Sequence, residues 1–137
     1  MGEHLKLAGE WDNISQTNLD EMLQKIGINF LKRKVAVQLK PSQAISFDEN
    51  KMTVIADTPV TKGEAKVVPL DGSEFSEEMF DNTLVASATV NADGSITVKG
   101  KVCNMDLTAV RRINEAGKMI LTTTLDGVEC ERVFIRK

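Results

Sequence analysis

The sequence predicts a mainly β domain whose strands follow one another as an antiparallel meander. From residue 44 to the C-terminus, short strand-like runs alternate with turn signals such as Asp71-Gly72, Asp93-Gly94 and Asp126-Gly127. The length of 137 residues suits a single domain, 1–137, and is too short for two ordinary cores. About ten such strands should close on themselves or form two sheets, because open strand edges invite aggregation.

The N-terminal third combines one strand with two helices. The first strand is expected from Leu5 to Ser15, and His4 before it is expected in a frayed terminus. Asn18 or Thr17 can then serve as the N-cap of a helix that ends at Gly27. The apolar residues at helical spacing in this helix are Leu19, Met22, Leu23 and Ile26. A second helix is expected from residue 28 to about 37, before Lys40-Pro41.

The later elements are expected to be strands. Their ranges are 44–47, 52–57, 64–70, 83–90, 95–103, 106–114, 119–125 and 128–136. Pro69 ends its strand, since a proline cannot donate to a ladder. The acidic pairs Asp48-Glu49 and Glu77-Glu78 fall in expected loops, where solvated charge is the ordinary explanation.

Two arginines interrupt apolar rows of the last strands. Because strand side chains alternate between faces, Arg132 shares a face with Phe134, and Arg111 shares a face with Leu107. A guanidinium keeps its proton, so its burial without a partner costs several kcal/mol. A distant carboxylate, water or a bound acid would pair with or solvate this charge. Alternatively, one or both arginines lie at a strand end and reach solvent.

Several function classes have little support. The net charge of −3 and the pI near 5.2 argue against nucleic-acid binding. His4 is the only histidine, so neither a histidine-based catalytic site nor a histidine-ligated metal site is expected. We therefore expect a protein that is not an enzyme and has no metal or cofactor.

The cellular compartment is expected to be the cytoplasm. No apolar run approaches the ~20 residues needed to span a bilayer, and the N-terminal residues lack the apolar core of a signal peptide. Cys103 and Cys130 lie in strand-like runs and lack metal-ligand spacing, so they are expected to be reduced packing residues, with a disulfide as the alternative.

A basic run, Lys32, Arg33 and Lys34, lies on the second expected helix. Such a run is either a solvated face or a site that attracts an anionic membrane surface or partner. It is the candidate membrane contact of the chain.

Several motifs, in order and spacing, resemble those of the intracellular lipid-binding proteins, which include fatty-acid-binding and cellular retinoid-binding proteins. The similarity runs over nearly the whole chain. It is strongest in Gly9-Glu10-Trp11, in residues 18–41, in Thr108-Ala109-Val110-Arg111 and in residues 128–134.

The resemblance implies a ten-stranded antiparallel up-and-down barrel of the calycin or lipocalin type, with a helix-turn-helix lid. Such a barrel holds a hydrophobic acid in a water-containing cavity, with its carboxylate on two arginines and a tyrosine. By position, Arg111 and Arg132 look like those arginines. Phe134 stands where the tyrosine usually is, and the chain contains no tyrosine. Asn13, Leu19 and Val60 are further departures, and Val60 replaces the usual portal phenylalanine.

The leading hypothesis is a monomeric cytoplasmic carrier of a long-chain fatty acid or similar apolar carboxylate, with transient contact to anionic membranes. The residues expected to bind the ligand are Arg111, Arg132, Phe134, Leu23, Ile26, Phe30, Val60, Leu121 and Thr123. A retinoid or bile-acid carrier is the alternative within the same class. A structural protein of the membrane surface, which would use Lys32, Arg33 and Lys34, is the alternative from a different class.

Overall fold

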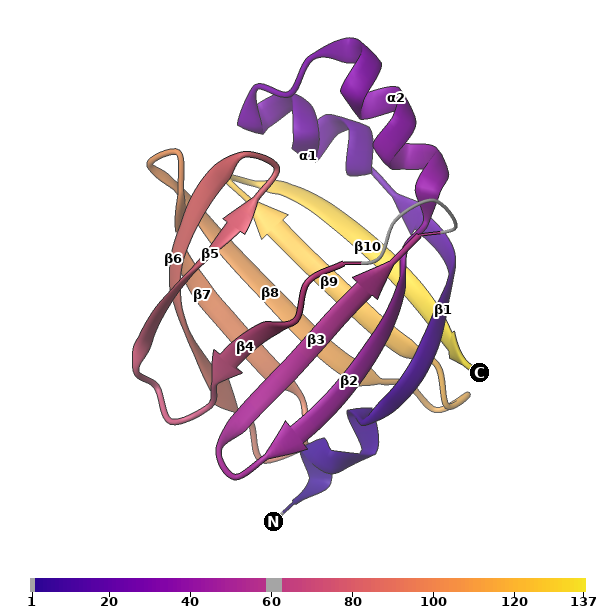
Figure 1. The fold of residues 1–137 in the computed structure, drawn as a ribbon, viewed down its shortest axis with the longest axis vertical. Coiled ribbons are helices and arrows are strands. Elements are labelled where there is room, and N and C mark those ends of the chain that lie inside the picture. Colours follow the sequence, from indigo (N-terminus) through magenta and orange to yellow (C-terminus); the bar gives the residue numbers. More distant parts are fainter. Residues whose placement is uncertain (1, 59–62) are drawn as a thin grey trace.

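Ten antiparallel strands curve around a common interior beneath two short helices in the computed structural model, which describes residues 2–58 and 63–137 (Figure 1). The strands are β1 (Gly9–Thr17), β2 (Ser42–Asp48), β3 (Lys51–Asp57), β4 (Lys66–Pro69), β5 (Glu74–Met79), β6 (Asn82–Val90), β7 (Ile96–Val102), β8 (Met105–Ile113), β9 (Met119–Leu125) and β10 (Val128–Arg136). The helices are α1 (Leu19–Ile26) and α2 (Phe30–Leu39). The predicted mainly β class and the lidded ten-stranded barrel are confirmed.

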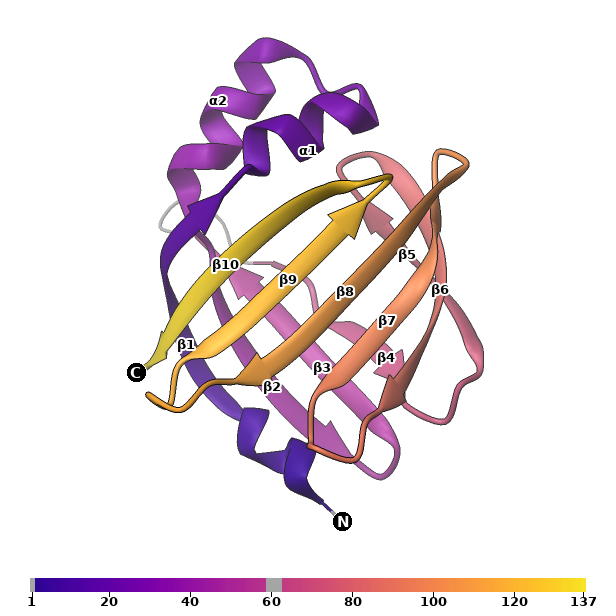
Figure 2. The ribbon, with the colours of Figure 1, turned by 180° about the vertical axis from the view of Figure 1, so that it is seen from behind.

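The strands form one sheet in the order β4-β3-β2-β1-β10-β9-β8-β7-β6-β5. All neighbours in this order are consecutive in sequence except β1 and β10, whose pairing brings the two ends of the chain together. Within the described residues, β4 and β5 are not paired in a backbone ladder, so the barrel is nearly closed with one gap in its ladder. Strands β7 to β10 run without interruption on the other side (Figure 2).

The C-terminal hairpin matches the sequence prediction at both strands. Asp126 and Gly127 join β9 to β10, and both have positive φ angles, 48° and 87°. Such angles suit the short turns that follow the right-handed twist of the strands. The register then sets Arg132 opposite Leu121, and Arg111 is opposite Leu121 on the other side of β9.

Helix α1 covers one end of the barrel with an apolar face. Its four buried residues recur at helical spacing, and they are Leu19, Met22, Leu23 and Ile26. The backbone N–H of Gly27 closes the helix on the carbonyls of Leu23 and Gln24. Asn18 occupies the N-cap position, but its side chain donates to the carbonyl of Glu129 at 3.1 Å and does not cap the helix.

Helix α2 begins later than predicted because Asn29 caps it. The Asn29 Oδ1 accepts a hydrogen bond from the Lys32 backbone N–H at 3.0 Å, so the first helical residue is Phe30. None of its residues is fully buried. The helix therefore lies on the outside of the lid, next to α1.

Two sequence predictions for local structure are wrong. The expected strand from Leu5 begins only at Gly9, since a short 3-10 helix, Glu3–Leu7, precedes it and packs His4 against Phe47 with ring centroids 5.1 Å apart. Strand β5 was missed because its sequence Glu-Phe-Ser-Glu-Glu-Met is rich in charges that disfavour strands. A strand whose only ladder partner is β6 tolerates such charges, which protect an edge from aggregation.

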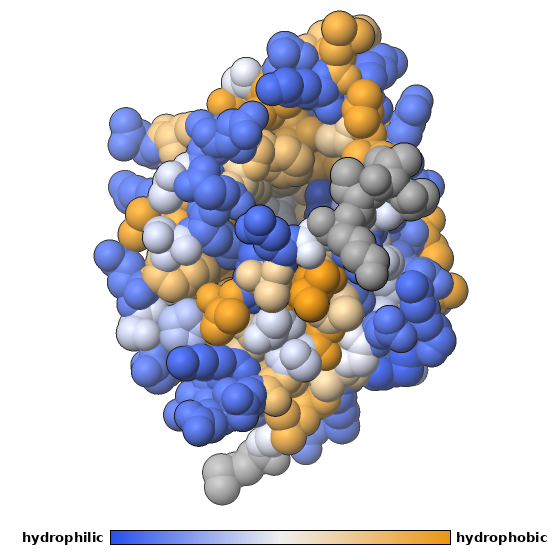
Figure 3. All heavy atoms as spheres, in the orientation of Figure 1, coloured by the Kyte–Doolittle hydropathy of each residue, from blue (hydrophilic) through white to orange (hydrophobic). Residues whose placement is uncertain are grey.

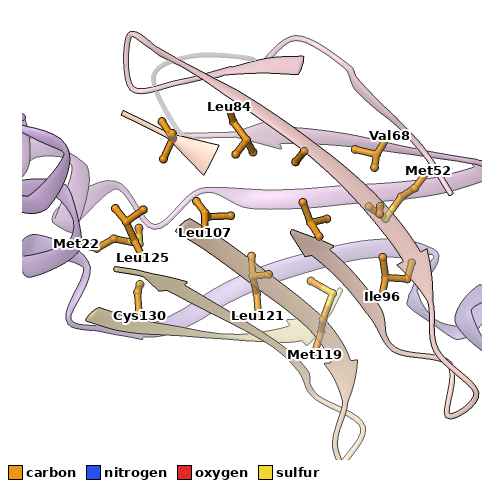
Figure 4. Packing of buried hydrophobic residues seen from close by; sticks show 14 of the residues in the cluster. Met22, Met52, Val68, Leu84, Ile96, Leu107, Met119, Leu121, Leu125 and Cys130 are labelled. Atoms are coloured by element: carbon orange, nitrogen blue, oxygen red, sulfur yellow. The ribbon is translucent and has the colours of Figure 1, made fainter. Parts of the chain in front are cut away.

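Buried apolar side chains from most strands meet inside the barrel (Figure 4). Met119, Leu121 and Ile96 approach from the continuous strands, and Met52 and Val68 from β3 and β4 (Figure 4). Met52, Val68 and Leu121 also line a space inside the barrel that reaches Met22 of the lid.

Candidate ligand cavity

A cavity of about 440 Å³ lies inside the barrel and reaches the lid. This volume is within the range of roughly 300–1,000 Å³ that small-molecule sites occupy. The apolar residues on its wall include Met22 of α1, Met52, Val68, Leu84, Leu107 and Leu121. In the space-filling view the surface is hollowed below the helices, with residues of apolar and intermediate hydropathy inside the hollow (Figure 3).

A second hollow, of about 850 Å³, is larger but lies on the outside of the barrel at the end away from the lid. It is bounded by the N-terminal 3-10 helix and by the β6–β7 and β8–β9 turns, and its charged residues, such as Asp93 and Arg112, are of both signs. It touches neither Arg111 nor Arg132. The smaller interior cavity is therefore the candidate site.

The structure brings Arg111 and Arg132 together on the cavity wall. They line the cavity from β8 and β10, on the face that the alternation of side chains predicts, and both residues are half-buried. Burial lowers the pKa of Arg111 to about 10; the Glu77 carboxylate partly offsets this effect, and the nearby Arg132 guanidinium adds to it. Burial also lowers the pKa of Arg132. Both groups remain cationic at neutral pH.

No carboxylate of a described residue lies within salt-bridge distance of either guanidinium. One Arg111 terminal nitrogen donates to the Gln43 Oε1 at 2.9 Å, while the buried Arg111 Nε has no hydrogen-bond partner. Beside Arg132 lies the thiol of Cys130, whose pKa is raised by burial and only partly lowered by the guanidinium. The thiol is therefore protonated at neutral pH and gives no counter-charge.

The predicted ligand-binding residues fall into three groups. Arg111, Arg132, Leu121 and Thr123 line the cavity. Leu23, Ile26 and Phe134 are buried in the surrounding core, and the Phe134 side chain is fully buried. Phe30 is 58% exposed on α2, and Val60 lies outside the described residues.

Sequence reasoning missed several polar groups on the cavity wall. Gln43 precedes the buried Ile45 by two positions on β2, so alternation would have found it if the predicted strand had begun at residue 42 and not at residue 44. Glu77 lines the cavity from the unpredicted β5. It pairs with Lys66 of β4 at 3.3 Å, and the Lys66 Nζ also donates to the Glu78 carbonyl at 2.7 Å. These contacts join the two strands that lack a ladder.

The basic run on α2 divides into different roles. The Arg33 Nε contacts the Asp20 carboxylate at 3.0 Å and its terminal nitrogen donates to the Ile28 carbonyl at 2.8 Å, so this residue ties α2 to α1. Lys32 pairs with Asp81 of the β5–β6 turn at 3.5 Å, with both side chains well exposed. The Lys34 Nζ lies 5.3 Å from the centre of the Phe30 ring.

The two cysteines have different environments, and both are free thiols. Cys130 is a buried packing residue, as expected. Cys103 is not: it follows β7 in an exposed turn with φ of 52°, and its thiol lies 3.2 Å from the Asn82 Oδ1.

Within the described residues, no group of three or more His, Cys, Asp or Glu side chains could hold a metal ion. No helix in this part of the chain combines the length and apolarity needed to cross a membrane.

Known proteins resemble the chain over almost its whole length. It is 35% identical to a fatty acid-binding protein type 3 of Fasciola hepatica over 124 residues, which are 89% of this chain and 91% of the relative. It is 31% identical to the mouse (Mus musculus) fatty acid-binding protein 9 over 93% of this chain and 95% of the relative. The mouse cellular retinoic acid-binding protein 2 is 29% identical over 95% of this chain and 97% of the relative.

Solved structures agree on the fold. A point mutant of the REP1-NXSQ fatty acid transporter superposes with a TM-score of 0.87 at 24% identity, covering 97% of this chain and 99% of that one. No family model matches the chain. The relatives are named for ligands and not for reactions, in agreement with the prediction that the protein is not an enzyme. Identity above 30% over at least 89% of both chains shows that this chain belongs to the intracellular lipid-binding protein family.

Proposed function

We propose that the protein is a cytoplasmic carrier that binds a long-chain fatty acid, or a similar apolar carboxylate, inside its barrel and releases it unchanged. The observation that carries this proposal is the pair of inward guanidinium groups, which face an otherwise largely apolar cavity without a described carboxylate partner. A carboxylate would neutralise this charge through paired hydrogen bonds. The apolar tail would leave water at a gain of ~0.8 kcal/mol per buried CH₂.

The name of the 35% identical relative supports a fatty acid as the ligand. The relative that binds retinoic acid favours a second candidate, because retinoic acid is also an apolar carboxylate and would meet the same arginines. The two candidates differ in the tail: a flexible chain adapts to an irregular cavity, whereas a retinoid needs a matching shape. Competition between palmitate and retinoic acid for the delipidated protein would rank them.

The headgroup role is tested by calorimetric titration of delipidated protein with palmitate and with 1-hexadecanol. The parent protein should prefer the acid. Arg132→Gln should weaken palmitate binding about tenfold or more, because a hydrogen bond to a charged group is lost, and should leave hexadecanol binding unchanged. Arg112→Gln is the matched control, since Arg112 follows Arg111 on β8 but is exposed. An Arg132→Gln protein that binds palmitate as tightly as the parent would refute the proposal.

We also propose that α2 makes transient contact with anionic membranes when the ligand is exchanged. The exposed apolar residues Phe30, Leu31 and Val35 accompany Lys32 and Lys34 on this helix. Apolar and basic residues together favour an anionic lipid surface.

The cavity is built from one chain, so the carrier is proposed to act as a monomer.

Sedimentation with phosphatidylserine vesicles tests this contact. Binding should occur at low salt and be largely lost at about 0.15 M salt, where surface charges are screened beyond roughly 8 Å. The double variant Lys32→Gln, Lys34→Gln should bind less at low salt. Stable binding at physiological salt would instead favour a structural role at the membrane.

A further inference from the structure

The cavity contains a polar side chain that the arginine site does not account for. Gln43 of β2 is only 7% exposed and lines the cavity together with Arg111 and Arg132. Strands β2 and β8 are four places apart in the sheet order, so the 2.9 Å hydrogen bond from Arg111 to Gln43 crosses the interior. A long-range contact of this kind holds the guanidinium from the opposite wall.

The direction of this hydrogen bond fixes the orientation of the Gln43 amide. A guanidinium only donates, so the oxygen of the amide must face Arg111 and its nitrogen must face away. That nitrogen carries two N–H donors, and neither bonds to a described residue. The Arg111 Nε is a third donor without a partner in the same region.

Donors therefore outnumber acceptors at this end of the cavity. The one carboxylate that also acts on Arg111, that of Glu77, is already paired with Lys66 at 3.3 Å. A carboxylate accepts several hydrogen bonds and donates none, whereas an alcohol brings a donor that needs an acceptor.

We propose that Gln43 is a specificity-determining residue of the headgroup site: its carbonyl positions Arg111, and its amide N–H donates to the carboxylate of the ligand. This inference rests on the proposed function, which supplies the acid. It adds to the two arginines a neutral donor that selects acids over alcohols.

A direct test uses the parent protein with labelled side-chain nitrogen. Nuclear magnetic resonance should show the Gln43 amide and the Arg111 Nε–H signals moving downfield when palmitate is added, because each gains a charged acceptor. Equimolar 1-hexadecanol should move them much less. Palmitate that moves the arginine signals and leaves the Gln43 amide unchanged would overturn the role of Gln43.

Substitution gives the second test, by calorimetry with the same two ligands. Gln43→Met keeps the length of the side chain without its hydrogen bonds, and should weaken palmitate binding about tenfold while leaving hexadecanol binding unchanged. Gln43→Glu should weaken palmitate binding further, since the new carboxylate would neutralise Arg111 and repel the acid. Gln24→Met is the matched control, because it makes the same substitution at an exposed glutamine of α1 that does not line the cavity.

The outcomes separate this inference from the proposed function. If the parent protein does not prefer palmitate to hexadecanol, both the proposed function as a carrier of acids and the proposed role of Gln43 are wrong. A parent that prefers palmitate, with a Gln43→Met variant that keeps the same preference, would overturn only the role of Gln43. The ratio of the two affinities is the deciding quantity, because a general loss of structure would weaken both ligands alike.

Discussion

Two sides of the barrel hold together in different ways. On the continuous wall, formed by β7 to β10, every strand is hydrogen-bonded to both of its neighbours. At the gap edge, formed by β4 and β5, the ladder is interrupted, and side chains such as Lys66 make the connection. The wall carries Arg111 and Arg132, so the charged groups stand on the more rigid side. The gap edge is the side expected to open locally at lower cost.

The largest expected difference is in core packing. Phe134→Ala on the wall should lower the free energy of unfolding by roughly 3–5 kcal/mol, because the side chain is fully buried. Val67→Ala at the gap edge should change it by no more than ~0.5 kcal/mol, since Val67 is 53% exposed. Urea denaturation of the ligand-free proteins measures both values. Equal losses would show that the two sides contribute alike.

The next effect has the opposite sign. Arg132→Met should raise the free energy of unfolding of the ligand-free protein by about 1–2 kcal/mol, because a buried cation without a described ion-pair partner is replaced by an apolar side chain. Arg112→Met, on the exposed face of β8, should have little effect. A destabilised Arg132→Met protein would mean that the guanidinium is well solvated inside the barrel.

The buried guanidinium of Arg132 is expected to lower the stability of the ligand-free fold. The same substitution should reduce the preference for palmitate over hexadecanol. If the Arg132→Met protein is more stable than the parent and binds palmitate less tightly, Arg132 serves ligand binding and not the stability of the fold.

A smaller effect is expected at the connection across the gap. Lys66→Met should change global stability by less than ~1 kcal/mol, since exposed ion pairs contribute little. Hydrogen exchange of the β5 amides should nevertheless become faster, because their link to β4 is lost. Lys101→Met is the control: Lys101 pairs with Asp106 at 3.6 Å between strands that are also joined by a ladder. Unchanged exchange in β5 would show that Lys66 does not hold the gap.

The same contrast explains how far the sequence predicts the structure. The bounds of β9 and β10 follow from alternation and from Asp126-Gly127, because a hairpin is specified by neighbours in sequence. Strand β5 does not follow, because its inward Phe75, Glu77 and Met79 alternate with polar residues in a stretch dominated by charge. Local sequence patterns therefore predict the strands of the continuous wall but not β5 at the gap edge, which has a single ladder partner.

The site divides along similar lines. The inward direction of Arg111 and Arg132 is a property of each strand and was predicted from residue spacing. The hydrogen bond between Arg111 and Gln43 joins residues 68 positions apart on opposite walls, so it depends on how the sheet curves. No local pattern carries that information. Once β2 is known to begin at Ser42, alternation places Gln43 inside, but only the curved sheet gives it a partner.

The smallest effect is expected at a matched pair of turns. Asp93 in the β6–β7 turn and Asp71 in the β4–β5 connection each accept a hydrogen bond from a serine hydroxyl at 2.6 Å and from its backbone N–H at 2.9 Å. The hydroxyl hydrogen bond is the main cause that lowers the pKa of each carboxyl below its ordinary 3.8. The serine beside Asp93 is buried, whereas the serine beside Asp71 is exposed.

Asp93→Asn should therefore destabilise the protein more than Asp71→Asn, and both losses should be small because asparagine keeps an acceptor. A carboxyl whose pKa is lowered in the folded state stabilises the protein above its unfolded pKa, and this contribution disappears as the pH falls through the folded pKa. Each variant should differ from the parent at pH 7 and approach it below pH 3.8. Urea denaturation across this pH range gives the comparison, and a larger loss for Asp71→Asn would mean that the gap edge depends on its loop more than the wall depends on its turns.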